Sequence, residues 1–234
     1  AHGCRIVQQA LEEASCRAVA EHLVELHGCV REAIRSPHAN YVLQKIVEVM
    51  PPAQTGFIVE ELHGAGAEVA CHRFGCRVLC RLVEHSATDD ASMALIDEVV
   101  GSAGMLCRQS FGHYVVQSVL EHGLPRQRQQ VCAALCDDLL KCVRSRYACY
   151  VIESALSFCA IEDQWGIAHG LLSGDPDDLA ALAREPFGSY TLRALLRQPG
   201  EASRRIRECL EAVAGQLQDT KYGRRVLEEM ETVH

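Results

Sequence analysis

The stretch FGHYVVQSVLEH, residues 111–122, recurs in variant form along the whole chain. The other copies are HGCRIVQQALEE (2–13), HANYVLQKIVEV (38–49), FGCRVLCRLVEH (74–85), YACYVIESALSF (147–158), FGSYTLRALLRQ (187–198) and YGRRVLEEMETV (222–233). Each copy has Gly or Ala as its second letter, and these small residues follow one another at intervals of 35 to 40 residues. Such a period indicates a solenoid of stacked helical units.

Each motif has the pattern of an amphipathic helix. Counting from the residue after the small one, positions three, four, seven and eight are apolar except at Thr191 and Glu231, and positions one, two, five and six are polar or variable. At about 100° per residue the two sets occupy opposite halves of a helix. His113, Tyr114 and Gln117 are therefore expected to project together from one side. The residues expected to pack inside are Val115, Val116, Val119 and Leu120.

The composition agrees with an all-α fold in one repeat domain spanning residues 1–234. Hydrophobic residues make up 48% of the chain and aromatic residues 5%, and strand-like alternation is scarce. The longest interval between motifs contains SGDPDD (173–178). This polar segment predicts a loop insertion within one repeat.

Charge and cysteine content exclude several classes of protein. A net charge of −8 argues against a general polyanion binder. The thirteen cysteines are odd in number and none forms a CxxC pair, so reduced thiols in a cytosolic or nuclear protein are expected. Of these two locations, we expect the cytoplasm. No apolar run reaches the length of a membrane span, and the chain does not open on a secretory leader pattern. No membrane association is expected.

The polar face carries a regular pair of columns. The second position holds a flat cation or an aromatic ring in every copy: Arg5, Tyr41, Arg77, Tyr114, Tyr150, Tyr190 and Arg225. The fifth position mostly holds hydrogen-bonding groups: Gln8, Gln44, Cys80, Gln117, Glu153, Arg193 and Glu228. A stacking group beside a group that can read a base edge, once per repeat, is what reading one base per repeat requires.

Local charge supports this interpretation. Positions one to six carry a small excess of basic residues over the acidic Glu153, Glu228 and Glu229. The basic residues are Arg5, Lys45, Arg77, Arg81, Arg193, Arg224 and Arg225. The polar face is thus expected to form a mildly basic lane on an acidic protein.

These motifs make the chain resemble the Pumilio (PUF) family of single-stranded RNA-binding proteins along essentially its whole length. The resemblance implies a right-handed, curved α-solenoid of three-helix repeats of about 36 residues. It also implies that RNA lies antiparallel to the protein on the concave face. The first and fifth positions would then contact the Watson–Crick edge, and the second would stack between bases.

The resemblance implies a base for most repeats. Cys4, Arg5 and Gln8 resemble an adenine reader. Two triads resemble uracil readers: Asn40, Tyr41 and Gln44, and His113, Tyr114 and Gln117. Cys149, Tyr150 and Glu153 resemble a guanine reader, and Ser189, Tyr190 and Arg193 resemble a cytosine reader. Cys76, Arg77 and Cys80 depart from the pattern because a thiol is a weak donor and a weak acceptor. The expected site is 5′-C-G-U-(A or any)-U-A-3′, close to the family's usual UGUA-type core, so a (U/C)GU core is expected. The last motif is expected to be a capping half-repeat.

Wider expectations also follow from the resemblance. It implies binding to 3′ untranslated regions of mRNA, with repression or decay carried out by recruited proteins such as a deadenylase complex on the convex face. A monomer without cofactor is expected. Because the family commonly has more repeats, we also expect that the first repeats are missing from this chain.

Four other interpretations fit the motifs less well. An enzyme needs a nucleophile and a base that converge on one place, whereas these polar groups are spread along an arc, so no catalytic residues are expected. Cys71, His72, Cys76 and Cys80 lack paired zinc-ligand spacing, and no metal site is expected. A protein-binding solenoid of the armadillo or HEAT kind and a low-specificity relative acting on ribosomal RNA stay open as alternatives.

Overall fold

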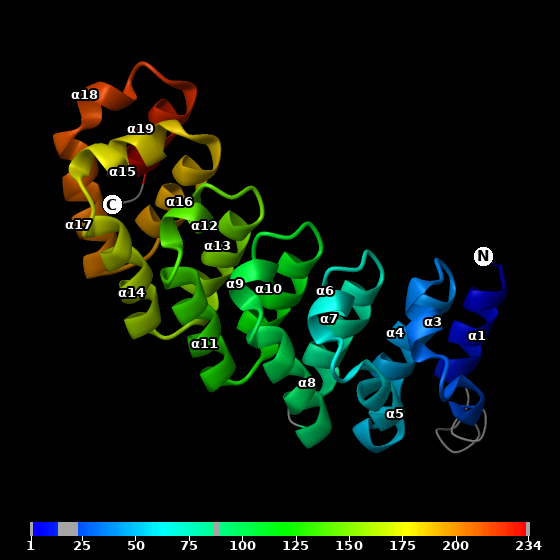
Figure 1. The fold of residues 1–234 in the computed structure, drawn as a ribbon. Coiled ribbons are helices and arrows are strands. Elements are labelled where there is room, and N and C mark those ends of the chain that lie inside the picture. The colour runs from blue at the N-terminus through cyan, green and yellow to red at the C-terminus, as the bar shows by residue number, and fades with distance from the viewer. Residues whose placement is uncertain (1, 14–22, 87–88, 233–234) are drawn as a thin grey trace. The chain divides into compact units, whose positions relative to one another are not determined.

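The computed structural model describes residues 2–13, 23–86 and 89–232, and the regular elements in these ranges are helices (Figure 1). Each of the seven motifs forms one long helix, as predicted. These helices are α1 (His2–Glu13), α4 (Ala39–Val49), α7 (Gly75–Ser86), α10 (Gly112–His122), α13 (Ala148–Phe158), α16 (Pro186–Leu196) and α19 (Lys221–Thr232). We call them the motif helices.

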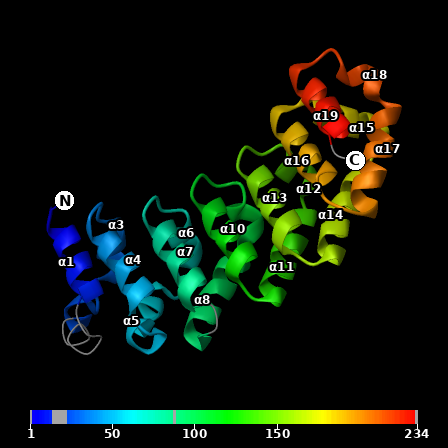
Figure 2. The same cartoon turned by 180° about the vertical axis from the view of Figure 1, so that it is seen from behind.

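Two further kinds of helix separate the motif helices (Figure 2). A longer helix follows most of them: α5 (Pro52–Leu62), α8 (Asp90–Val100), α11 (Pro125–Cys136), α14 (Ile161–Leu172) and α17 (Glu201–Ala212). A shorter one precedes the next motif helix: α3 (Val30–Arg35), α6 (Gly66–Ala70), α9 (Ala103–Leu106), α12 (Leu139–Val143), α15 (Pro176–Arg184) and α18 (Ala214–Leu217), with a single 3₁₀ turn η1 at Val24–Leu26. The repeat is therefore a three-helix unit, as the family resemblance implied.

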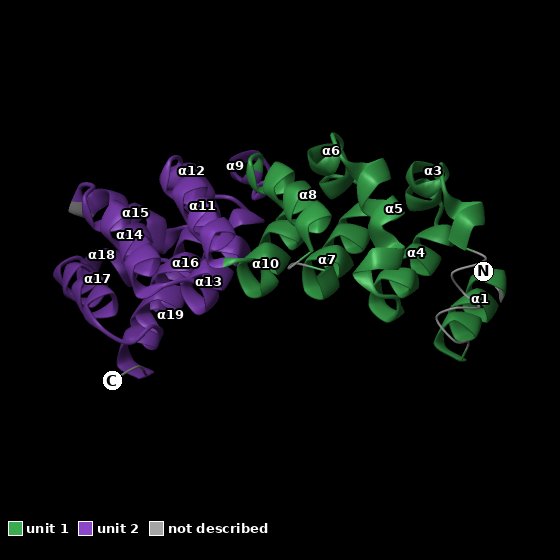
Figure 3. Cartoon of the chain, turned by 90° about the horizontal axis from the view of Figure 1, so that it is seen from below, with its two compact units in different colours: residues 1–102, 110–124 green, residues 103–109, 125–234 purple. Residues whose placement is uncertain are grey.

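The chain packs into two compact units, residues 1–102 with 110–124 and residues 103–109 with 125–234 (Figure 3). In the first unit the motif helices stack in the order α1, α4, α7, α10, and α5 packs on α8. In the second unit α13, α16 and α19 stack in order, with α11, α14 and α17 stacked beside them. Each unit is thus an all-α stack of repeats, which is the predicted solenoid class. That residues 1–234 form a single domain stays a prediction.

The apolar positions of most motifs are buried as predicted, whereas Ile6 and Val7 in the first motif are 60% and 44% exposed. Val115, Val116, Val119 and Leu120 are each at most 1% exposed. Burying an aliphatic side chain of this size stabilises a fold by about 1.5–3 kcal/mol. Because a repeat buries these side chains against its neighbours, the stacking itself is stabilised by the motif's apolar half.

The small residue of the motif is explained by a close backbone approach. A Cβ atom added at Gly75 would lie 2.6 Å from the carbonyl oxygen of Val69, and one at Gly188 would lie 2.3 Å from that of Leu182. In both cases the short helix runs its backbone against the first turn of the motif helix. Glycine at these positions is therefore required by packing.

Carboxylates join neighbouring repeats in the first unit. Glu61 on α5 accepts hydrogen bonds from the backbone N–H groups of Gly28 (2.6 Å) and Val30 (2.9 Å). Glu98 on α8 repeats the arrangement with Gly64 and Gly66. Each carboxylate satisfies N–H groups at the start of a short helix that its own backbone leaves unpaired.

The segment 173–178, predicted to be a loop insertion, differs from that prediction. Only residues 173–175 connect α14 to α15, and residues 176–178 form the first turn of α15. The side chain of Asp175 caps this helix by accepting from the N–H of Asp177 at 2.9 Å, and Pro176 occupies its first turn. Both are helix-start signals, so the extra residues lengthen the short helix of this repeat.

None of the helices in the described part of the chain is long and apolar enough to cross a lipid bilayer.

Candidate nucleic-acid interface

The second motif position lies outside on the motif helices. Tyr114 is 54% exposed, Tyr150 42% and Tyr41 38%. The side chains of Arg5 and Arg77 are also exposed, and Tyr190 is partly so. At about 100° around the helix from position one, this position is far from the packed half. Flat side chains are therefore presented at the predicted stacking positions.

The first position is buried instead of projecting, which corrects our expectation for His113. His113 is 3% exposed, Asn40 0%, and Cys149 1%. Cys76 and Ser189 are also buried, and Cys4 is partly exposed. The reason is angular: position eight falls about 20° from position one, so the first position lies at the edge of the apolar half.

The buried first-position side chains hydrogen-bond to carbonyl groups three or four residues earlier, at or just before the start of their helix. Asn40 Nδ2 donates to the carbonyl of Ser36 at 2.7 Å, and Ser189 Oγ donates to that of Pro186 at 3.0 Å. The thiols of Cys76 and Cys149 make similar, longer contacts to carbonyl oxygens three residues earlier. The ring of His113 lies 3.9 Å, centroid to centroid, from that of Tyr114. These groups thus help to fix the start of each motif helix.

The fifth position is partly exposed in every triad: Gln8, Gln44, Cys80, Gln117, Glu153 and Arg193. Gln44 Nε2 donates to Oδ1 of Asn40 at 2.9 Å, which links the first and fifth positions of one triad. Gln8 Nε2 donates to the carbonyl of Tyr41 at 3.1 Å. The fifth-position groups therefore sit between the exposed second positions and the buried first positions.

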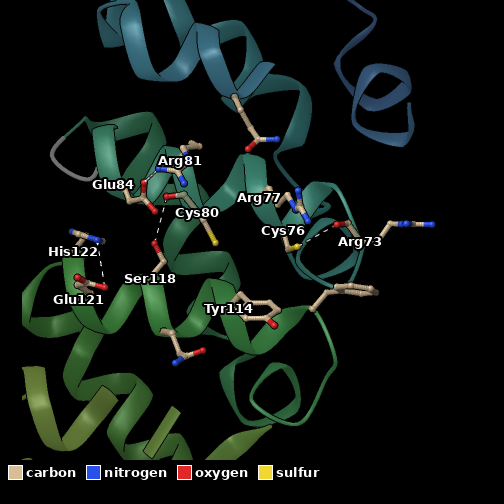
Figure 4. A pocket seen from close by; sticks show the side chains of 13 residues that line it. Arg73, Cys76, Arg77, Cys80, Arg81, Glu84, Tyr114, Ser118, Glu121 and His122 are labelled. Atoms are coloured by element: carbon tan, nitrogen blue, oxygen red, sulfur yellow. Dashed lines mark hydrogen bonds and ion pairs between the residues drawn. The ribbon is translucent and has the colours of Figure 1, made fainter. Parts of the chain in front are cut away.

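A hollow of about 750 Å³ lies on the polar faces of α7 and α10 in the first unit. Figure 4 shows the Cys80 sulfur directed into the space between Arg77 and Tyr114. Burial raises the pKa of the Cys80 thiol to about 12, so the group is uncharged near neutral pH. The hollow offers flat groups for stacking, whereas Cys80 supplies only a neutral thiol at the fifth position.

The fifth-position groups of the second unit form one polar network. The Tyr190 hydroxyl donates to Glu153, and Nη1 of Arg197 lies 3.8 Å from the same carboxylate. Burial, together with the bond to Glu153, raises the pKa of Tyr190. Arg193 Nε donates to Glu229 at 2.8 Å. The predicted guanine and cytosine readers are therefore held by neighbouring side chains.

Ion pairs neutralise part of the predicted basic lane, namely Lys45, Arg81 and Arg193, which sequence reasoning missed. Lys45 Nζ lies 2.8 Å from Glu12 and 2.7 Å from Glu48. Arg81 forms ion pairs with Glu48 and Glu84. These glutamates, with Glu121, occupy position nine of the first four motifs. That position falls at about 80°, in the middle of the polar half. The tally of charged residues in the motifs stopped at position six and so left out these glutamates.

The remaining side chains of chemical interest are the cysteines and the residue types that can bind metal ions. Over residues 2–13, 23–86 and 89–232, the cysteines are free thiols, and no group of three His, Cys, Asp or Glu side chains could hold a metal ion. Cys132 and Cys159 are a buried pair with sulfur atoms 3.2 Å apart.

The repeats match a known family of repeat proteins. The model of the Pumilio-family RNA-binding repeat matches residues 1–24, 35–63, 67–100, 104–136 and 144–169, which is more than half of the chain.

Curated relatives are more distant in sequence. A putative pumilio homolog 10 of Arabidopsis thaliana is 26% identical over 201 residues, covering 84% of this chain and 37% of its own length. A Pumilio domain-containing protein of Schizosaccharomyces pombe is 24% identical, covering 100% of this chain and 34% of its own length. The chain thus spans about a third of the length of these relatives.

Solved structures share the fold. PUF-8 in complex with PBE-RNA matches with a TM-score of 0.91 at 22% identity, over 98% of this chain and 68% of that one. The Puf4 RNA-binding domain bound to a 3′ UTR recognition sequence from HO endonuclease RNA matches with a TM-score of 0.86 at 22% identity, over 99% and 72%.

Proposed function

Because the chain belongs to the Pumilio family of RNA-binding repeat proteins, we propose that it binds single-stranded RNA sequence-specifically, one base per repeat. The observation that carries the proposal is the spacing of exposed flat side chains along successive motif helices, such as Tyr41 and Tyr114. Stacking on such groups contributes about 1–3 kcal/mol per base. Each lies beside a partly exposed fifth-position group that can select the base.

The proposed site is 5′-C-G-U-(A or any)-U-A-3′. Glu153 supports the G because a carboxylate accepts from the N1–H and N2–H₂ groups of guanine. Arg193 supports the C because a guanidinium has only donors to offer to an edge of acceptors. The neutral thiol of Cys80 supports a relaxed fourth base. We assign no base to the last motif.

The biological role is a proposal by similarity. PUF-8 and Puf4 were solved with RNA, and the Puf4 sequence comes from a 3′ UTR. By extension we propose that this chain acts in the cytoplasm on 3′ untranslated regions, as a non-enzymatic adaptor for repression or decay. Proteins that dock on its convex face, such as a deadenylase complex, would carry out that step.

Selection from a random RNA pool, followed by sequencing, tests the proposal. Enrichment of a GU core followed by a variable base and then U-A is expected. A pool without enrichment would contradict the proposal and favour a protein-binding solenoid. The variant Glu153→Gln is the internal check: its selected RNAs should lose the G and keep the other bases, because amide NH₂ cannot accept from guanine.

A further inference from the structure

The last motif contributes a carboxylate to the neighbouring base-reading position. Glu229 lies at position six of the last motif, on α19, and α19 packs against α16, which carries Arg193. Its Oε2 accepts from Nε of Arg193 at 2.8 Å. Its side chain is only 11% exposed, although it bears a charge. A charge this well covered persists only when it is paired.

A second arginine completes the contact. Nε of Arg197 donates to Oε1 of Glu229 at 2.8 Å, and Nη2 donates to Oε2 at 3.0 Å. These hydrogen bonds lower the pKa of Glu229, so the carboxylate is ionised at neutral pH. The paired, fork-like contact of Arg197 fixes the plane of the carboxylate. Glu229 is therefore a rigid acceptor for Arg193.

Anchoring at Nε affects how Arg193 can meet a base. The guanidinium is planar, with one N–H on Nε and four on the two Nη atoms. When Nε is tied to Glu229, the plane is set and Nη donors stay available for a ligand. A long arginine side chain that is already ordered loses less conformational entropy when it binds.

Discrimination between cytosine and uracil needs this fixed plane. The two bases share an acceptor at O2, but N3 accepts in cytosine and carries a proton in uracil. A pair of guanidinium donors held in one plane matches adjacent O2 and N3 acceptors and meets a donor at N3 of uracil. A guanidinium free to rotate could contact O2 alone and accept either base.

We infer that Glu229 is a positioning residue, which holds Arg193 in the orientation that selects cytosine at the first base of the site. The capping motif then takes part in base selection without contacting a base. This inference rests on the proposed function. The inference extends the proposed function because it assigns a role to Glu229, a residue of the motif that reads no base.

The test measures binding of labelled RNAs that contain 5′-CGUAUA-3′ or the same sequence with U as its first base. Wild type, Glu229→Gln and the control Glu231→Gln are compared by fluorescence anisotropy. Glu231 is exposed on the same helix, so its variant has the same change in charge. We expect Glu229→Gln to lower the C-over-U ratio of affinities by roughly tenfold, the scale of a base contact. The control should keep the wild-type ratio.

The outcomes separate this inference from the proposed function. If wild type binds and prefers C but Glu229→Gln keeps the ratio, or if Glu231→Gln lowers it equally, positioning by Glu229 is refuted and RNA binding stands. A wild type that binds without preferring C also refutes it. If wild type binds neither RNA, both proposals fail. Should Glu229→Gln not fold, as judged by circular dichroism, Glu229→Asp replaces it: the charge is kept, the reach is shortened, and the ratio should still fall.

Discussion

Cys80→Gln should give the chain a preference for adenine at the fourth base, where we expect little choice in the wild type. The triad Cys4, Arg5 and Gln8 differs from Cys76, Arg77 and Cys80 only at the fifth position. The substitution therefore builds a second copy of the chain's own adenine pattern. A glutamine amide supplies both a donor and an acceptor to the adenine edge, which a thiol does poorly.

The structure sets the size of the effect. Cys80 faces a hollow of about 750 Å³, so the longer side chain has room without displacing the core. A base-edge contact is worth about 1–3 kcal/mol, which corresponds to about a fivefold to 150-fold preference. Dissociation constants for four RNAs that differ only at the fourth base measure it.

Cys80→Ala is the matched control, because it removes the thiol and adds no reading group. It should bind the four RNAs about equally and leave stacking on Arg77 intact. The reasoning is refuted if Cys80→Gln also binds the four RNAs equally while still selecting the other bases. It is equally refuted if the wild type already selects one fourth base strongly, because a neutral thiol should not.

Three further changes test packing, stacking and charge. Gly188→Ala should destabilise the fold by about 1–3 kcal/mol in urea unfolding, because its Cβ would lie 2.3 Å from the Leu182 carbonyl oxygen; unchanged stability would contradict the close approach. Tyr114→Ala should weaken RNA binding by about 1–3 kcal/mol with the same base ranking, and a changed ranking would mean that Tyr114 reads a base. Glu84→Gln should remove one of the two carboxylates paired with Arg81, tighten binding at low salt and steepen the salt dependence by up to about 0.7 in log–log slope, whereas an unchanged slope would contradict a contact between Arg81 and a phosphate.

The fold was predictable because apolar periodicity is read directly from sequence. The burial of Val115 and Leu120 follows from helical angles alone. His113 was predicted to be exposed because it is polar, although its helical angle is only about 20° from that of the buried Leu120. The turn that precedes a motif helix also covers the first position of the motif. This burial depends on the path of the chain and cannot be predicted from helical angles alone.

Side-chain pairing between repeats was not predictable to the same degree. Glu84 could have been predicted from position nine of the motif, since its angle lies within the polar half. The contact of Glu229 with Arg193 joins residues 36 positions apart, and no local pattern distinguishes Glu229 from its neighbour Glu228. Only the packing of α19 on α16 makes one of them an acceptor for arginine.

The acidic position nine also bears on how selectivity arises. Nonspecific affinity for nucleic acid comes mainly from cations that neutralise phosphates, and here Lys45 and Arg81 are already paired with glutamates. Those glutamates lie at about 80° on the helix, close to the second position at 100°. A phosphate chain passing there gains little until bases stack and edges match. The same arrangement therefore lowers the sequence-independent part of the affinity, and a larger share of the binding free energy must come from stacking and base-edge contacts, which differ between a matched and an unmatched sequence.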